Sequence, residues 1–205
     1  MHSFMELARS RRSIRKYLPD PVGSEKLSRL LEAGALAPSG NNTQPWRFIV
    51  VQDRSMKERL YKVAGEQSWI LEAPVTIAVV GDVSAKVKAP SGTEGKISVD
   101  DPKNRTALFK TIRDTTIAAD HIVLAAQDEG LGTCWIALFE QQEIRPVLSV
   151  PESCYVVALI TVGLPAESPK PKPRHRLQEI VFKDKYGLRF EEGGIECPAA
   201  KGEKA

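Results

Sequence analysis

Two segments of the chain are apolar at nearly every position, and they restrict the folds it can adopt. They are PVTIAVVG (74–81) and CYVVALITVG (154–163). Each has the length of a buried β-strand and is far too short to span a membrane. Neighbouring side chains of a strand point to opposite faces, so such runs suit a sheet that is covered on both sides. The sequence therefore predicts a sheet with no face open to water.

Helical patterns alternate with these strands and would supply the cover. Apolar residues recur at three- and four-residue steps over 27–34 and over 56–64. The longest such pattern covers 108–126, and Gly130 is placed to end it. An S-x-x-E capping box predicts a short helix over 4–9.

The other elements follow from shorter patterns. RFIVVQD (47–53) and GTCWIAL (132–138) are expected to be extended, and a brief helix is expected near 141–148. Periodicity is lost over 37–45, which predicts a loop, and over 82–104, which predicts a variable surface excursion. Helices and strands that alternate around one core imply a single domain of the α/β type.

The C-terminal part has a different character. PAESPKPKPRHR (165–176) is rich in proline and basic residues, so it should be stiff and extended. EIVFKDKYGLRF (179–190) either adds a short strand or lies along a partner subunit. We expect one domain over 1–190, followed by a flexible tail over 191–205.

Composition excludes several classes of protein. The net charge of the 205 residues is only +3, which does not indicate a general nucleic-acid binder. The cysteines are few and odd in number, form no CxxC pair and lie near no histidine cluster, so neither a disulfide framework nor a metal site is expected. There is no apolar secretion signal at the N-terminus and no membrane span, so a cytoplasmic protein is expected.

Positive charge is concentrated in two short clusters near opposite ends of the chain. RSRRSIRKY (9–17) carries five cations, and Arg174-His175-Arg176 forms the second cluster. Guanidinium groups together with serine hydroxyls and backbone N–H groups are a natural receptor for a phosphate monoester. Taken singly, each cluster also fits an ordinary solvated surface. Their convergence on one dianionic group is a hypothesis that sequence spacing alone does not establish.

The loop APSGNNTQPWRF (37–48) combines small residues with several amides. Amide side chains carry donors and acceptors together, as the edge of a heteroaromatic ring does. The loop therefore suits the edge of such a ring, although an ordinary turn before a strand has a similar composition.

Several motifs together resemble those of the nitroreductase family of FMN-dependent oxidoreductases. They occur in the family's order over roughly residues 5–187: RRSIRKY (11–17), PSGNNTQPWRF (38–48), EAPV (72–75), GLGTCWIALF (130–139) and PKPRHR (171–176). The resemblance implies an α+β fold, an α/β sandwich with a central mixed, mainly antiparallel sheet flanked by helices. It further implies a homodimer with FMN at the subunit interface and a C-terminal extension that reaches the partner subunit.

The resemblance also assigns cofactor contacts, position by position. The phosphate, the ribityl chain and the pyrimidine edge fall to Arg11, Arg12, Ser13 and Arg15, with Arg174 and Arg176 completing the phosphate clamp. Contacts from the other subunit fall to Pro38, Ser39, Gly40 and Asn42. The ring near its N5 edge is assigned to Ile136, Ala137 and Leu138, with a further contact from Gln67. No catalytic side chain is assigned.

The implied reaction is a ping-pong transfer of hydride from NADH or NADPH through flavin N5 to an electron-poor small molecule, such as a nitroaromatic or a quinone. The same FMN fold also serves dehalogenation, dehydrogenation and flavin breakdown, so these reactions remain alternatives. A non-enzymatic polyanion-binding protein is a third, remote alternative. No aromatic residues interleave with the cations of 169–176, which argues against nucleic acid as a partner.

One position departs from the family pattern. Relatives with a similar GTCWI segment commonly continue with glycine, whereas Ala137 and Leu138 follow here. A leucine near N5 would narrow the cavity above the flavin or redirect which edge of the ring is open, so a preference for slender acceptors or an enforced substrate angle is expected. Residues 82–104 are where such proteins often build a lid, and they are a second expected determinant of specificity.

Overall fold

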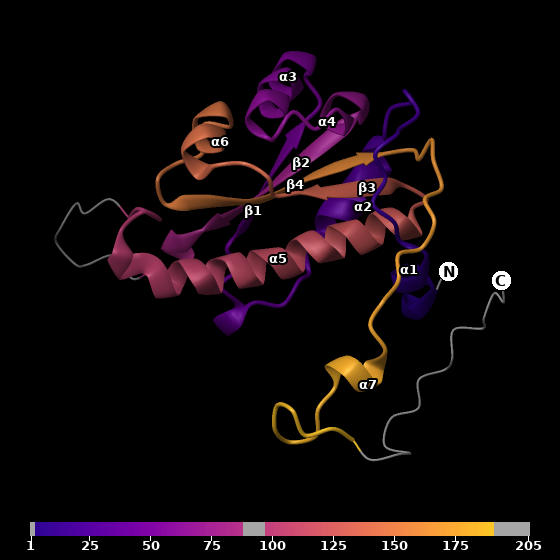
Figure 1. Ribbon diagram of the computed structural model, residues 1–205. Helices are drawn as coiled ribbons and strands as arrows, with labels where there is room; N and C mark the ends of the chain where they lie inside the picture. Colours follow the sequence, from indigo (N-terminus) through magenta and orange to yellow (C-terminus); the bar gives the residue numbers. More distant parts are fainter. Residues whose placement is uncertain (1–2, 88–96, 191–205) are drawn as a thin grey trace. The chain divides into compact units, whose positions relative to one another are not determined.

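The computed structural model describes residues 3–87 and 97–190. The chain divides into two compact units, Met1–Pro169 and Lys170–Ala205. The first unit contains a four-stranded antiparallel sheet with the strand order β1-β2-β4-β3 (Figure 1). Its strands are β1 (Trp46–Val51), β2 (Val75–Asp82), β3 (Gly132–Ile136) and β4 (Cys154–Gly163).

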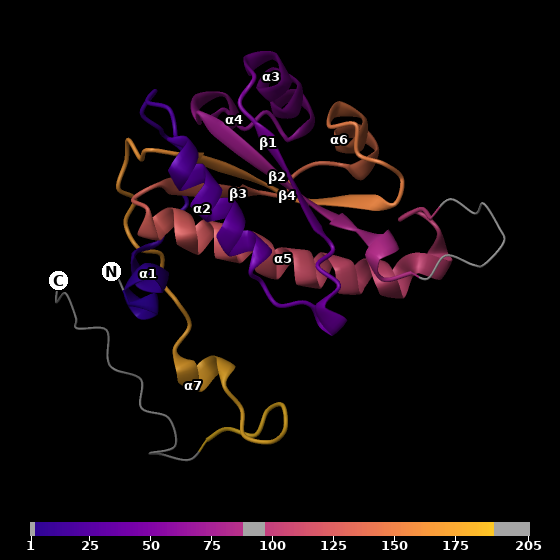
Figure 2. The ribbon, with the colours of Figure 1, turned by 180° about the vertical axis from the view of Figure 1, so that it is seen from behind.

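Helices cover both faces of this sheet. The first unit contains α1 (Phe4–Ser10), α2 (Ser24–Ala35), α3 (Arg54–Val63), α4 (Trp69–Glu72), α5 (Arg105–Asp128) and α6 (Gln141–Val147). It also has the short 3₁₀ turns η1 (Gly40–Asn42), η2 (Val83–Ala85) and η3 (Pro102–Asn104). Helices α2 and α5 lie on one side of the sheet, and α3, α4 and α6 lie on the other (Figure 1). Figure 2 shows α2 packed against α5.

Alternation along β2 explains why the sheet needs two covers. Ile77 joins the core beneath α2 and α5, where Leu30 and Ile122 are fully buried. Ala78, the next residue, joins the core beneath α3 and α6 with Leu60. The prediction of a sheet buried on both faces is therefore confirmed, as is the mainly antiparallel α+β fold.

The helix ends follow their sequence signals. The Ser3 hydroxyl accepts a hydrogen bond from the Glu6 backbone N–H at 3.3 Å, and the Glu6 carboxylate accepts one from the Ser3 backbone N–H at 2.6 Å. This is the predicted capping box of α1. After α5, Gly130 adopts a left-handed backbone with φ 71°, which only glycine adopts without cost. The Leu131 N–H then bonds to the Ala126 carbonyl and closes the helix end.

Of the two alternatives for 179–190, a short strand is not observed in these described residues, and a place along a partner subunit stays a prediction. The second unit instead has a short helix, α7 (Leu177–Ile180), and no strand among its described residues. The Glu179 carboxylate accepts hydrogen bonds from the Arg176 backbone N–H at 3.2 Å and from the Arg176 guanidinium at 3.0 Å. These bonds cap the first turn, so a local helix start prevails over an alternating pattern that has no strand to pair with.

Other expectations are only partly within reach of the described residues. The excursion over 82–104 contains η2 and η3 in its described parts, whereas 88–96 and the tail over 191–205 lie outside the described residues. The single domain over 1–190 stays a prediction. Helix α4 was not expected, because four residues are too few to show a helical period.

Candidate functional site

The basic segment at residues 11–17 forms an extended border along the edge of the sheet. Ser13 pairs with Thr133 of β3 in a parallel bridge, and the Ile14 N–H donates to the Thr133 carbonyl at 2.8 Å. Further along, Tyr17 bridges to Pro165, which follows β4. These two bridges hold the segment against the edge of the sheet. At Ser13 the segment runs parallel to β3.

The buried side chain of Tyr17 fixes this segment to the sheet through hydrogen bonds. Its hydroxyl donates to the Ile14 carbonyl at 2.6 Å and lies 2.7 Å from the hydroxyl of Thr161 on β4. Burial raises the pKa of Tyr17, so the phenol stays protonated and keeps its donor. Burial likewise raises the pKa of Cys134, which is 2% exposed and behaves as a small packed side chain rather than a reactive thiol.

The arginines of this border have guanidinium N–H groups that are available to a ligand. Within 3–87 and 97–190, neither Arg11 nor Arg15 forms an ion pair with a carboxylate. Arg12 donates from Nη1 to the carbonyls of Arg9 and Arg11, at 2.7 and 2.8 Å. Its Nε is buried and has no hydrogen-bond partner in the described part of the chain. A buried donor without a partner is costly, so the site fits an anion that would accept from it.

Two other side chains brace Arg15. Its guanidinium lies 5.1 Å from the ring centroid of Trp69, a cation–π distance. The Glu167 carboxylate accepts the backbone N–H groups of Arg15 and Lys16, at 2.6 and 3.2 Å. Because Glu167 bonds to the backbone, it fixes the course of the segment without neutralising the guanidinium groups through hydrogen bonds.

The donor set of this border therefore fits the phosphate of FMN. Guanidinium groups, the Ser13 hydroxyl and the unpartnered Arg12 Nε are the groups that bind phosphate monoesters. Several positive charges without a paired carboxylate would also favour an anionic ligand over a neutral one. The residues present are compatible with the cofactor that the sequence motifs imply.

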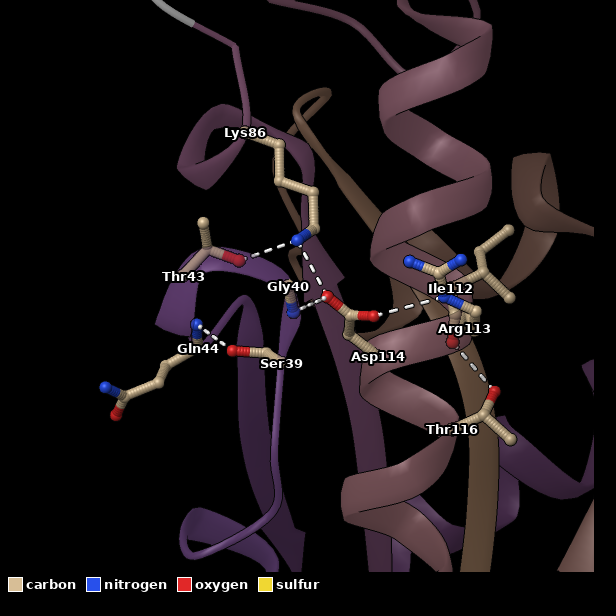
Figure 3. A network of polar contacts seen from close by, with 9 residues as sticks. All are labelled: Ser39, Gly40, Thr43, Gln44, Lys86, Ile112, Arg113, Asp114 and Thr116. Carbon is tan, nitrogen blue, oxygen red and sulfur yellow. Dashed lines mark hydrogen bonds and ion pairs between the residues drawn. The ribbon is translucent and has the colours of Figure 1, made fainter.

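A second predicted element, the loop that follows α2, is anchored in the interior (Figure 3). The Gly40 N–H donates to the Asp114 carboxylate of α5 at 2.9 Å, and Lys86 Nζ bridges the same carboxylate and the Thr43 hydroxyl, at 2.7 and 2.6 Å. The side chains of Asp114 and Lys86 are only 3% and 8% exposed. Asn42 remains exposed on the surface of the loop.

This buried carboxylate makes an expected contribution to acid sensitivity. Burial alone would raise the pKa of Asp114, but hydrogen bonds from Lys86 and Gly40 outweigh it and lower the pKa below its ordinary value. A lowered native pKa stabilises the fold above the unfolded pKa of about 3.9, and this stabilisation is lost as the pH falls through the native pKa. Thermal unfolding measured between pH 7 and pH 2.5 should show it.

Asp114→Asn should lower the melting temperature at pH 7. Its melting temperature should also fall less steeply than that of the wild type as the pH is lowered, which gives a flatter acid limb of the stability curve. Glu58→Gln removes a carboxylate of α3 that pairs with Arg54 on the exposed surface, and it serves as the control. Parallel acid limbs for the wild type and Asp114→Asn would contradict the assignment.

The residues that were predicted to lie along the flavin ring near N5 occur at the C-terminal end of β3 and directly after it. Ile136 is 1% exposed and packs into the core, and its expected contact with the flavin ring stays a prediction. Leu138 follows the strand and is 67% exposed. A methyl group on Gly65 would lie 2.7 Å from Leu138 and 3.8 Å from the Gln67 amide. Leu138 and Gln67, which are distant in sequence, are therefore brought together.

The remaining predicted contacts are not joined to this site by the described coordinates. Arg174 and Arg176 belong to the second unit, where both are exposed, and Arg176 pairs with Glu179. Their convergence with Arg11 stays a prediction. The expected contact of Pro38, Ser39, Gly40 and Asn42 with a partner's cofactor also stays a prediction.

Sequence reasoning missed the supports of the site: Trp69, Lys86, Asp114 and Glu167. One signal was available. Asp114 falls on the buried face of the long helix, between Thr111 and Ala118, where an acid requires a partner. The other supports depend on tertiary contacts that leave no local pattern.

Comparisons with known proteins agree with this fold. The Nitroreductase family model matches residues 8–164. An "NADH dehydrogenase" of Thermus thermophilus is 30% identical over 190 residues, covering 85% of this chain and 93% of the relative. An "FMN reductase [NAD(P)H]" of Bacillus subtilis is 29% identical over 189 residues, covering 91% of this chain and 75% of the relative.

Among solved structures, a nitroreductase family protein of Clostridium novyi NT superposes with a TM-score of 0.68. It is 32% identical, and the match covers 95% of this chain and 100% of the other. The chain therefore belongs to the nitroreductase family, and it is an oxidoreductase.

Among the described residues, no helix is both long and apolar enough to cross a membrane. The same residues contain no group of three or more histidine, cysteine or acidic side chains arranged to hold a metal ion.

Proposed function

We propose that this oxidoreductase is a homodimeric, FMN-dependent enzyme that takes electrons from NADH or NADPH and reduces an electron-poor small molecule. The observation that carries the proposal is the basic border, whose arginines keep free donors beside β3 and include the buried Arg12 Nε. The names of the Thermus and Bacillus relatives support the nicotinamide donor, and that of the Bacillus relative supports the flavin.

In this proposal the chain's residues bind and orient the cofactor. Arg11, Arg12 and Ser13 hold the phosphate and ribityl chain, and Arg15 lies toward the pyrimidine edge. Arg174 and Arg176 complete the clamp on the phosphate. Positive charge near the pyrimidine edge also favours the reduced, anionic cofactor and raises its potential.

The bound FMN would supply the redox chemistry, accepting a hydride equivalent at N5 and passing its electrons on in a second half-reaction. Ala137 and Leu138 border the space where donor and acceptor bind in turn. The loop over 38–42 reaches the cofactor of the partner subunit. Nitroaromatics and quinones are the acceptors that the family resemblance favours.

Anaerobic titration of the FMN-loaded protein with NADH and NADPH tests the reaction. Either nucleotide should bleach the yellow cofactor, and an oxidant panel of nitroaromatics and quinones should restore the colour. A yellow protein that neither nucleotide bleaches would contradict the proposal and favour another FMN reaction, such as dehalogenation. A protein that binds RNA with a steep salt dependence but takes up no FMN would favour polyanion binding.

Leu138→Gly should broaden the range of acceptors. The exposed side chain leans toward Gly65 and Gln67, so its removal widens the space at this end of β3. Bulky acceptors should gain about tenfold in kcat/KM, the scale of about one to two methylene groups of fit in an apolar pocket, and slender ones should change little. Leu138→Met retains the bulk and is the control. An unchanged acceptor profile in Leu138→Gly would count against this role.

A further inference from the structure

The loop after α2 has an unusual backbone for its sequence. Asn41, Asn42 and Gln44 have φ values of 55°, 52° and 45°, in the left-handed region that non-glycine residues seldom adopt. Each such residue costs on the order of 1 kcal/mol or more, although asparagine tolerates the region better than most. Three in four residues persist only when surrounding contacts determine the conformation.

Those contacts come mainly from one place. Inside the loop, the Ser39 hydroxyl accepts the Gln44 N–H at 3.0 Å, and the Gln44 amide donates to the Asn42 side chain at 3.1 Å. In the described part of the chain, hydrogen bonds from other elements reach residues 39–43 only through Asp114 and Lys86. At the end of the loop, Arg47 of β1 also donates to the Gln44 carbonyl at 3.2 Å. The conformation of residues 40–43 therefore depends on this ion pair (Figure 3).

Stability alone is a weak reason for such a pair. A buried ion pair loses its hydration, and replacement by apolar side chains of similar volume is often neutral or stabilising. The pair instead fixes the relative positions of three segments. It joins Lys86, which follows η2, to Asp114 within α5 and to the loop itself. The side-chain amides of the loop remain exposed to solvent.

We propose that Asp114 and Lys86 are positioning residues for the flavin site, because together they hold residues 40–43 in the conformation that presents this loop to the cofactor. This inference rests on the proposed function. Neither side chain touches the cofactor in this account. They act through the Gly40 N–H and the Thr43 hydroxyl, so the cofactor meets a loop whose conformational entropy is already lost.

A matched pair of variants isolates the positioning effect. Thr43→Val removes the hydroxyl that Lys86 binds while keeping the shape of the side chain and the ion pair. Thr43→Ser keeps the hydroxyl. We expect Thr43→Val to weaken FMN binding by about tenfold, the scale of a lost hydrogen bond to a charged group. Thr43→Ser should stay within about twofold of the wild type.

Lys86→Met should have a larger effect, about 10- to 100-fold, because it removes both the tether and the partner of Asp114. Lys57→Met is the control for general destabilisation. Lys57 is a buried lysine of α3 whose Nζ donates to the Ala73 carbonyl at 2.8 Å, and it does not contact the loop. Its replacement should lower stability but leave FMN affinity within about twofold.

Amide hydrogen exchange of residues 40–44, in the full chain before FMN is added, gives a readout independent of the cofactor. Exchange should rise in Thr43→Val and Lys86→Met and stay at the wild-type level in Thr43→Ser and Lys57→Met. Equal FMN affinity and exchange in Thr43→Val and Thr43→Ser would overturn the inference, as would an equal loss of affinity in Lys57→Met and Lys86→Met. If the wild type binds no FMN, the proposed function fails, and exchange alone decides whether the ion pair holds the loop.

Discussion

Arg11→Ala is expected to weaken the binding of FMN by about 1.5–3 kcal/mol, or about 10- to 150-fold in Kd. Arg11 lies in the basic border, which runs beside β3, and it is half-buried. It forms no ion pair among the described residues, so its charge is available to a ligand. A charge-assisted hydrogen bond to phosphate is among the stronger polar contacts that a protein makes. Quenching of FMN fluorescence on titration with the protein measures the effect.

Arg174→Ala should weaken binding over the same range, because the proposed clamp uses arginines from both basic clusters. Arg54→Ala is the control. Arg54 is an exposed arginine of α3 that pairs with Glu58, so its loss changes the net charge equally without touching the border. Unaltered FMN affinity in both Arg11→Ala and Arg174→Ala would remove the phosphate assignment.

Gly132→Ala is expected to damage both the fold and the site. A methyl group at this first residue of β3 would lie 2.7 Å from Ile14 Cγ1 and 2.9 Å from Ile14 Cβ. Ile14 is 6% exposed, and its backbone N–H is bonded to Thr133, so it has little room to move away. Overpacking of this kind costs about 1–3 kcal/mol. Because Ile14 lies within the basic border, its displacement should also move the neighbouring arginines.

We expect Gly132→Ala to lower the melting temperature and to weaken FMN binding by at least about tenfold, measured by thermal unfolding and fluorescence titration. Gly23→Ala is the control, since a methyl group at Gly23 would meet nothing within 4 Å. If Gly132→Ala matched the wild type in both measurements, the border would not be held as described.

The buried sheet was the part of the fold most open to prediction. A strand covered on both faces must be apolar throughout, and this rule located β4 at 154–163 and β2 within one residue of its observed bounds. The long helix was found because its apolar stripe and its terminal Gly130 agree. Such signals are local, so one sequence suffices to read them.

Contacts between segments that are distant in the sequence could not be predicted from the sequence alone. The pairing of residues 11–17 with β3 joins segments more than a hundred positions apart, and no periodicity within either segment indicates it. The same holds for Lys86 with Asp114 and for Trp69 with Arg15. The family motifs named the candidate contacts of the site, whereas the side chains that support those contacts came from the structure.

A comparison of FMN with riboflavin, titrated calorimetrically into the cofactor-free protein, tests the central claim most directly. The two ligands differ only in the phosphate that the arginines are proposed to hold. We expect about one FMN bound per chain, riboflavin bound more weakly by at least about 100-fold, and a smaller difference between the two ligands in Arg11→Ala. Equal affinity for the two ligands, or no binding of either, would contradict this claim.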